Sequence, residues 1–382
     1  MVSMESKLPS VGTTIFTVMS KMALDHKAIN LSQGFPDFDC PEQLRELVSY
    51  YLNHNKNQYP PMAGTPELRQ AIAEKLAHYY QHQADPETNI TVTSGATEAL
   101  FDAIQAVVHS GDEVIVFDPA YDSYQPAVDL AGGKTIHIPM TLPNYTIDWQ
   151  QVKDNITSRT RLIIINSPHN PSGATLSATD LQHLTDLIHN KDIYVLSDEV
   201  YEHMVYDGER HESVLRYPEL AAKSFAVFSF GKTYHATGWK LAYCVAPTQL
   251  TQEFRKIHQY VTFTTTSFLQ YAVADFMRAC PEHSRELPEF YQQKRNHFRA
   301  LLQNTVFTLL PCKGTYFQLV DYSNISDKSD TEFCEWLTKE VGVAAIPLSP
   351  FYAKAPTARH IRFCFCKDDA TLEQAVERLS KI

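Results

Sequence analysis

The middle of the chain alternates short apolar runs with stretches of helical periodicity. The apolar runs are residues 89–95, 112–121, 160–171, 192–201, 224–230 and 241–247. We interpret each run as a strand, followed by a turn in the runs 112–121 and 160–171, and their near-continuous apolar stretches are typical of strands covered on both faces. Strands that alternate with helices predict a mostly parallel sheet, and therefore a doubly wound α/β domain.

Two of the intervening helices have recognisable ends in the sequence. Residues 96–111 show helical periodicity, and Gly111 is expected to stop this helix. Residues 177–190 are expected to form another helix, with Ser177 as its N-cap and Asp180 three residues later.

The last hundred residues follow a different pattern. A helical stretch at 286–304 precedes short alternating strands at 314–322, 343–348 and 360–366, and a final helix closes the chain. This order predicts a smaller α+β domain. We expect residues 1–45 to form an N-terminal arm that joins the small domain, residues 46–280 the large domain, and residues 281–382 the C-terminal part of the small domain.

Composition narrows the class of partner and the compartment. The 33 basic and 44 acidic residues of the 382 give a net charge of −11, which argues against nucleic acid or an anionic membrane as a partner. Seven scattered cysteines favour reduced thiols, and no signal peptide or membrane-spanning run is present, so we expect a cytoplasmic protein. The pair Cys364 and Cys366 fits a strand better than a metal site. None of the sixteen histidines forms a metal-binding motif, and we predict no metal.

The tripeptide Gly231-Lys232-Thr233 invites comparison with the end of a phosphate-binding P-loop. A P-loop needs a glycine five positions before this tripeptide's first residue, and Ala226 stands there, inside an apolar run. A buried strand cannot serve as a flexible glycine-rich loop. Lys232 is therefore considered as a nucleophile in its own right.

Polar residues gather at the ends of the predicted strands, where open α/β sheets bind their ligands. Ser94 to Thr97 join a strand to a helix, a place where free backbone N–H groups can hold a phosphate. Tyr121, Asn170 and Asp198 follow other strands, and Tyr201 comes three residues after Asp198. Each also has an ordinary structural explanation: core packing for Tyr121, an Asn-Pro turn for Asn170, and a helix cap for Asp198.

Taken together, these residues resemble the pattern of a known family. Their order continues through the motif "SFGKTYHATGWK", which holds Lys232 and Lys240, to a late Arg362. The chain is similar in this respect to the class I and II aminotransferases, pyridoxal-phosphate enzymes of fold type I. The resemblance runs from "INLSQGFPDF" to "HIRFCF", and "DEVYEH" and "GVAAIPLS" bring it closest to the methionine, glutamine and kynurenine aminotransferases.

The resemblance implies how pyridoxal 5'-phosphate would be held. Lys232 would form a Schiff base with the cofactor, and Asp198 would pair with its pyridine nitrogen and keep it protonated. Asn170 and Tyr201 would bond the ring hydroxyl oxygen, and Tyr121 would stack on the ring. The phosphate contacts implied are the backbone of Ala96 and Thr97, the side chains of Ser229 and Lys240, and Tyr59 from the other subunit of a homodimer. Lys240 stands where the commoner pattern has arginine, which would provide a bidentate fork.

The resemblance also implies an amino-acid site. Arg362 would clamp the α-carboxylate, helped by Gly34 and Asn170, and Ile15 and Phe16 would wall the side-chain pocket. Lys232, Asp198 and Tyr201 would be the catalytic residues of a ping-pong transfer from an L-amino acid to a 2-oxo acid. The closer group favours uncharged donors, namely methionine first, then glutamine, aromatic residues and histidine.

Three other functions compete with amino transfer as interpretations of the sequence. A cysteine–sulfur β-lyase would share Lys232, Asp198 and Arg362. A ligand-sensing aminotransferase-like domain of a transcription regulator would need a DNA-binding module, for which the resemblance and the net charge leave no room. A nicotinamide dehydrogenase is disfavoured because no G-x-G-x-x-G follows a strand.

Overall fold

The computed structural model describes residues 4–382. A seven-stranded sheet forms its centre, in the order β2-β8-β7-β6-β5-β3-β4. Only β8 is antiparallel to its neighbours, so the prediction of a mostly parallel α/β sheet is confirmed. The strands are β2 (Ile90–Thr93), β3 (Glu113–Asp118), β4 (Lys134–Pro139), β5 (Thr160–Asn166), β6 (Tyr194–Asp198), β7 (Ser224–Ser229) and β8 (Ala242–Val245).

Helices cover both faces of this sheet, as the apolar strands require. In β5, Leu162 and Ile164 belong to one buried cluster and Ile163 and Ile165 to another, because successive side chains point to opposite faces. One face packs against α4 (Ala96–Val107), α5 (Tyr124–Leu130) and α10 (Thr248–Val261). The other packs against α3 (Pro66–Tyr80), α6 (Trp149–Asn155) and α7 (Ala178–Ile188).

Element ends agree with the sequence in one helix and differ in another. Helix α7 begins with the expected capping box, in which Ser177 and Asp180 exchange hydrogen bonds. Helix α4 ends at Val107, so the expected stop at Gly111 was wrong: this glycine lies in the following turn with φ of 88°. Strand β4 was not predicted. It is an edge strand with half-exposed positions, and therefore lacks a continuous apolar run.

The C-terminal part builds a separate four-stranded sheet in the order β12-β13-β10-β9. Its strands are β9 (Thr308–Leu309), β10 (Phe317–Asp321), β12 (Ile346–Pro347) and β13 (His360–Cys364). The predicted single strand at 343–348 is in fact two. Its first half, β11 (Val343–Ala344), pairs with the N-terminal β1 (Ile29–Asn30), and its second half joins the four-stranded sheet.

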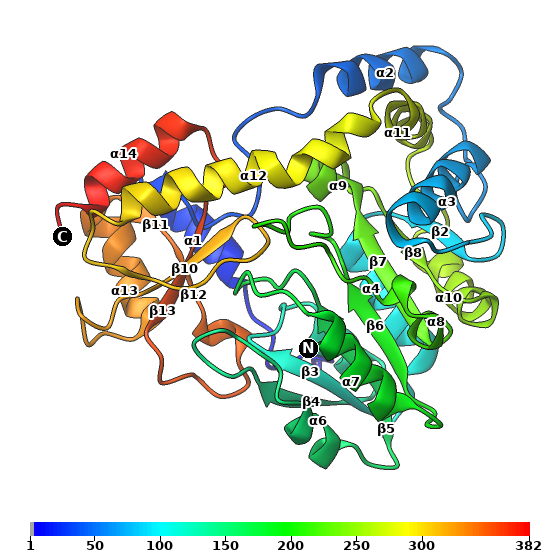
Figure 1. The fold of residues 1–382 in the computed structure, drawn as a ribbon, viewed down its shortest axis with the longest axis horizontal. Coiled ribbons are helices and arrows are strands. Elements are labelled where there is room, and N and C mark those ends of the chain that lie inside the picture. Colours follow the sequence, from blue (N-terminus) through cyan, green and yellow to red (C-terminus); the bar gives the residue numbers. More distant parts are fainter. Residues whose placement is uncertain (1–3) are drawn as a thin grey trace.

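The long helix α12 (Pro281–Leu302) runs past this sheet toward the helices on the far side of the molecule (Figure 1). The remaining helices are α1 (Ile15–Asp25), α2 (Glu42–Asn53), α8 (Pro218–Ala221), α9 (Phe230–Thr233), α11 (Ser267–Ala279), α13 (Asp330–Trp336) and α14 (Asp369–Leu379). Shorter helical turns are Val214–Arg216, Thr237–Trp239, Leu337–Val341 and Ser349–Phe351. The division into domains at residues 45 and 280 stays a prediction. Among residues 4–382, no helix combines the length and apolar character needed to span a membrane.

Candidate active site

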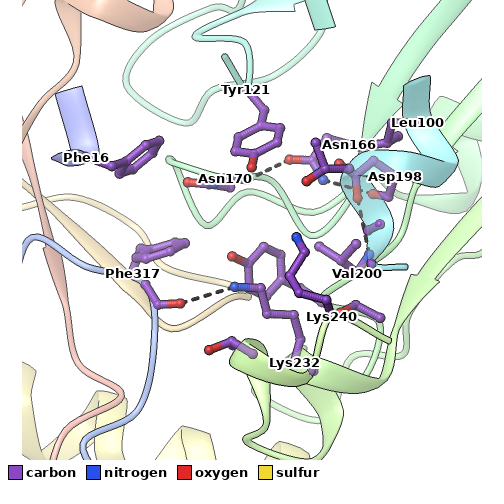
Figure 2. A pocket seen from close by; sticks show the side chains of 18 of the residues that line it. Phe16, Leu100, Tyr121, Asn166, Asn170, Asp198, Val200, Lys232, Lys240 and Phe317 are labelled. Carbon is purple, nitrogen blue, oxygen red and sulfur yellow. Dashed lines mark hydrogen bonds between the residues drawn. The ribbon is translucent and has the colours of Figure 1, made fainter. Parts of the chain in front are cut away.

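A cavity of about 310 Å³ lies where strands of the central sheet end. Strand β6 ends at Asp198, β7 ends at Ser229, and β2 is followed by the first turn of α4. Figure 2 shows Tyr121 and Lys232 on opposite sides of this space, with Asp198 and Asn170 between them. The predicted residues that line it are Phe16, Gly34, Ala96, Thr97, Tyr121, Asn170, Asp198, Tyr201, Ser229, Lys232, Lys240 and Arg362.

The amine of Lys232 points into the cavity from the short helix α9, which directly follows β7. It lies 2.8 Å from the Tyr316 hydroxyl and 3.1 Å from the Gly34 carbonyl. Burial lowers the pKa of Lys232 to about 8, and the positive charges of Arg362 and Lys240 add to the effect. A larger fraction of this amine is therefore neutral, and nucleophilic, than of an exposed lysine.

The carboxylate of Asp198 is buried at the end of β6, with 4% of its surface exposed. The Tyr124 hydroxyl donates to its Oδ2 at 2.7 Å, and the Asn166 amide donates to its backbone carbonyl at 2.9 Å. Burial raises the pKa of Asp198 to about 6, partly offset by the Tyr124 hydrogen bond. A positively charged hydrogen-bond donor in the cavity would stabilise the ionised form of this carboxylate and return its pKa toward the ordinary range.

The turn that starts α4 is shaped to receive an anion. Gly95 is the N-cap with φ of 88°, so the N–H groups of the first helical turn, which begins with Ala96 and Thr97, have no partner within the helix. A Cβ on Gly95 would lie 2.9 Å from Cε of Lys240, so only glycine lets that lysine pass so close. Ser229 and Lys240 also line the cavity, and Lys240 packs against Gly95. Free N–H groups, a hydroxyl and an ammonium together suit a phosphate.

Arg362 comes from β13 of the smaller sheet and is 1% exposed. Its Nη1 donates to Oδ1 of Asn170 at 2.7 Å, and its Nη2 donates to the Ser32 carbonyl at 2.8 Å. The guanidinium lies over the Phe317 ring, 3.8 Å from its centre. Its Nε is buried without a hydrogen-bond partner among the described residues. A buried cation with a free donor, held flat by an aromatic ring, suits a planar carboxylate.

Two tyrosines frame the middle of the cavity. Tyr121 follows β3, and burial raises the pKa of its hydroxyl to about 12. Tyr201 is 3% exposed, burial raises the pKa of its hydroxyl well above the usual range, and its ring lies 5.5 Å from Nζ of Lys232. Both therefore stay protonated and can act as hydrogen-bond donors.

Some predicted residues lie outside this cavity. In the described chain, Ile15, the first residue of α1, borders a neighbouring surface hollow instead. Its place in the side-chain pocket stays a prediction. Tyr59 is 84% exposed and lies away from its own chain's cavity.

The sequence did not reveal several residues that line the cavity or contact its lining. Tyr124 and Asn166 bind Asp198 from an element start and a strand end, positions at which many residue types occur. Phe317 and Tyr316 come from β10 and the residue before it, in a part of the chain with no motif of its own. Only the three-dimensional arrangement brings these four side chains to the site.

Comparison with known proteins agrees with this geometry. Residues 26–379 match the family described as aminotransferase class I and II. The chain belongs to this family. It is an aminotransferase, with the fold of the pyridoxal-phosphate enzymes of fold type I.

Individual relatives cover almost the whole aminotransferase chain. A methionine aminotransferase of Escherichia coli (strain K12) is 51% identical over 378 residues, which are 99% of this chain and 98% of the relative. A solved structure from Escherichia coli, described by its methionine aminotransferase function, has a TM-score of 0.98 at 51% identity and covers 100% of both chains. Human kynurenine–oxoglutarate transaminase 1 is 33% identical over 396 residues, 94% of each chain.

Aminotransferases of class I and II depend in general on pyridoxal 5'-phosphate. The residues of this cavity fit that group. The first turn of α4 and Lys240 offer N–H donors and a positive charge to a phosphate, while Asp198 offers a buried acceptor to a protonated ring nitrogen. Lys232 offers a buried amine of lowered pKa to an aldehyde.

Proposed function

We propose that this aminotransferase binds pyridoxal phosphate in the described cavity and transfers the amino group of methionine and other uncharged L-amino acids to a 2-oxo acid. The observation that carries the proposal is the convergence of Lys232, Asp198 and Arg362 on one cavity from three different elements. Such convergence of a nucleophile, a buried carboxylate and a carboxylate-binding cation is the physical requirement of this chemistry.

Each residue has a separate task in the proposed reaction. The bound cofactor supplies a sink for the electron pair left at the substrate Cα. Arg362 holds the substrate α-carboxylate, which fixes the Cα–H bond in the cavity. The neutral amine of Lys232 would then accept the Cα proton and deliver it to the cofactor carbon that takes over the amino nitrogen, and its lowered pKa makes the neutral form available. Asp198 accepts a hydrogen bond from the ring nitrogen and stabilises its positive charge.

The preference for uncharged side chains follows from the cations that line the cavity. In the described part of the chain these are Lys232, Lys240 and Arg362, and each already has a task. Within one subunit, none of these three cations is left for a second substrate carboxylate. The rings of Phe16 and Phe317 give an apolar wall near Arg362. Methionine leads because the relative with 51% identity is a methionine aminotransferase. The names of the relatives support amino transfer and give no support to a carbon–sulfur lyase as the main activity.

The proposal includes a homodimer with shared sites. Tyr59 is 84% exposed, and its ring packs edge-on at 5.6 Å against Phe263, which is itself 44% exposed. Tyr260 nearby in sequence is 86% exposed. Exposed aromatic residues of this kind are enriched at protein interfaces. A second subunit would cover them and receive Tyr59 at the phosphate of its cofactor. We also propose a cytoplasmic location, since all seven cysteines are unpaired thiols.

A visible absorption spectrum tests the proposal directly. We expect the purified protein with pyridoxal phosphate to be yellow, and methionine without any 2-oxo acid to bleach the band. Addition of a 2-oxo acid then restores the colour, because the amino group leaves again. A protein that stays colourless with added cofactor would overturn the proposal. A yellow protein that responds to glutamine or aromatic amino acids but ignores methionine would overturn only the substrate preference.

The lowered pKa of Lys232 predicts a pH dependence of cofactor loading. Only the neutral amine attacks the cofactor aldehyde, and the neutral fraction rises with pH until the pKa is passed. We therefore expect the loading rate of cofactor-free protein to rise with pH and to level off above pH 8, since burial lowers the pKa of Lys232 to about 8. An ordinary lysine would keep the rate rising to about pH 10. Stopped-flow absorbance over this range measures the rate, and a plateau only near pH 10 would contradict the prediction.

A further inference from the structure

Three ionisable side chains meet below the first turn of α4, outside the cavity. Glu98 and Asp102 lie one helical turn apart on α4, and His258 faces them from α10. Nδ1 of His258 is 2.6 Å from Oε1 of Glu98 and 3.6 Å from Oδ2 of Asp102. His258 and Asp102 are fully buried. None of the three has a task in the proposed reaction.

The contacts of His258 define where its protons are. Its Nε2 lies 3.0 Å from the backbone carbonyl of Met62, which can only accept, so Nε2 carries a proton. Its Nδ1 faces the acceptor Glu98. Both ring nitrogens therefore act as donors, and the ring is a cation with Glu98 and Asp102 as its counter-charges. Burial opposes this charge, but the contacts with Asp102 and Glu98 outweigh it and raise the pKa of His258 to about 9.

Asp102 has no other use in the structure. Both of its oxygens are buried without a hydrogen-bond partner among the described residues. Burial raises the pKa of Asp102 to about 6, and the contact with His258 opposes that rise. A metal ion is a poor explanation of the cluster, because Nδ1 of His258 is already within hydrogen-bond distance of Glu98 and Nε2 is turned toward Met62. The cluster is a buried charge network in which His258 bonds Glu98 and Met62, and Asp102 is a nearby counter-charge.

The network joins the two segments that carry the exposed aromatic residues. Met62 follows Tyr59 by three residues, and its carbonyl is held by His258. The backbone carbonyl of His258 accepts from the N–H of Phe263 at 2.9 Å, and Thr264 donates to the carbonyl of Pro61 at 3.3 Å. The His258 side chain thus contacts the 59–62 loop, while its backbone carbonyl accepts from the turn after α10, so the loop and the turn meet at this residue.

We propose that His258 is a positioning residue whose bond to Met62 holds the 59–62 loop in the conformation that presents Tyr59 to the other subunit's active site. Glu98 and Asp102 orient the imidazole and keep both of its nitrogens protonated. The inference rests on the homodimer of the proposed function. A substitution of His258 in one subunit should therefore lower activity in the other subunit's active site, which does not contain that His258.

Hybrid dimers with one working site separate the two subunits' contributions. In the first hybrid, Lys232→Ala inactivates one subunit and the other subunit carries His258→Asn. The working site then lies in the His258→Asn subunit and receives an intact 59–62 loop from its inactive partner. In the second hybrid, one subunit carries both substitutions and the other is wild type. The working site then lies in the wild-type subunit and receives the 59–62 loop of the doubly substituted one. A hybrid of wild type with Lys232→Ala is the reference.

We expect the first hybrid to match the reference in kcat/KM and in affinity for the cofactor. The second should lose about tenfold in both, as befits one lost hydrogen bond from a charged donor. The side-chain amide of asparagine can take the place of Nδ1 but is too short to bond the Met62 carbonyl. His258→Gln places an amide donor near the position of Nε2, and should keep the second hybrid within about twofold of the reference, a rescue expected from restoring that one bond.

The remaining outcomes would contradict either the role of His258 or the proposed aminotransferase dimer. A loss confined to the first hybrid would mean that His258 serves its own site through α4. Equal losses would show a general structural role, and no loss in either would show none. Asp102→Asn keeps the shape of the side chain and should show the same pattern with a smaller loss, even if His258→Asn does not fold. A monomeric wild-type protein would overturn the dimer and this inference together, while its response to methionine would still decide the amino transfer.

Discussion

Substituting arginine for Lys232 is expected to lower the rate of amino transfer by at least about 10²–10⁴-fold, the usual contribution of a well-placed general base. Arginine keeps a long side chain and a positive charge in the cavity. It stays protonated at all accessible pH values, however, and can neither attack an aldehyde nor accept a proton from Cα. The charge of Lys232 is thereby tested separately from its basicity. Single-turnover decay of the absorption band with methionine measures the effect.

The same substitution at another lysine provides the control. Lys223 donates to the backbone carbonyls of Ile188 and Lys191, far from the cavity lining, and an arginine can make similar bonds. We expect Lys223→Arg to retain nearly full activity. If Lys232→Arg kept more than about a tenth of the wild-type rate, Lys232 would not be the base, because arginine cannot supply general-base catalysis of the usual size.

The sequence was most informative where local chemistry and periodicity agree. The buried strands β5, β6 and β7 are apolar almost throughout, and the helices that follow them make the parallel arrangement the simplest solution. A polar residue directly after such a strand must lie at the carboxyl edge of the sheet. Asp198 could therefore be placed at the ligand-binding edge from the pattern alone, whereas the family resemblance placed Lys232 in the same site.

The sequence was least informative where tertiary contacts decide the structure. Strand β4 exists because its backbone pairs with β3, not because its side chains are apolar. Val343 and Ile346 read as one strand, yet they pair with β1 and β13, in two different sheets. Ile15 and Phe16 are adjacent, and only the orientation of α1 decides that Phe16 faces the cavity.

Hydrogen-bond partners within the site are equally invisible in the sequence. Tyr124 looks like any aromatic residue at the start of a helix, and its role depends on the position of Asp198, 74 residues later. The contact between His258 and Met62 joins residues 196 positions apart. Neither contact can be recognised from the neighbouring sequence, because each residue is of a type that is common at its position in a helix or loop.

Replacing Arg362 by lysine should cost about 3–4 kcal/mol of transition-state stabilisation, or about 10²–10³-fold in kcat/KM for the amino donor. The substitution keeps the positive charge but removes the planar fork that meets a carboxylate with two parallel hydrogen bonds. It also removes the flat contact with the Phe317 ring, 3.8 Å from the guanidinium. The loss should fall mainly on KM, since the α-carboxylate is bound in the ground state as well as in the transition state.

The matched control is Arg359→Lys, three residues earlier, where the side chain is 35% exposed and pairs with Asp327. An exposed ion pair contributes at most about 1 kcal/mol, and lysine can replace it, so this variant should behave as wild type. Steady-state kinetics with methionine, together with the cofactor band of each variant, separates substrate binding from cofactor binding. A normal cofactor band with a raised KM in Arg362→Lys alone would assign the α-carboxylate to Arg362. An unchanged KM in that variant would mean that the carboxylate is bound elsewhere, and the orientation of the substrate in the cavity would have to be reversed.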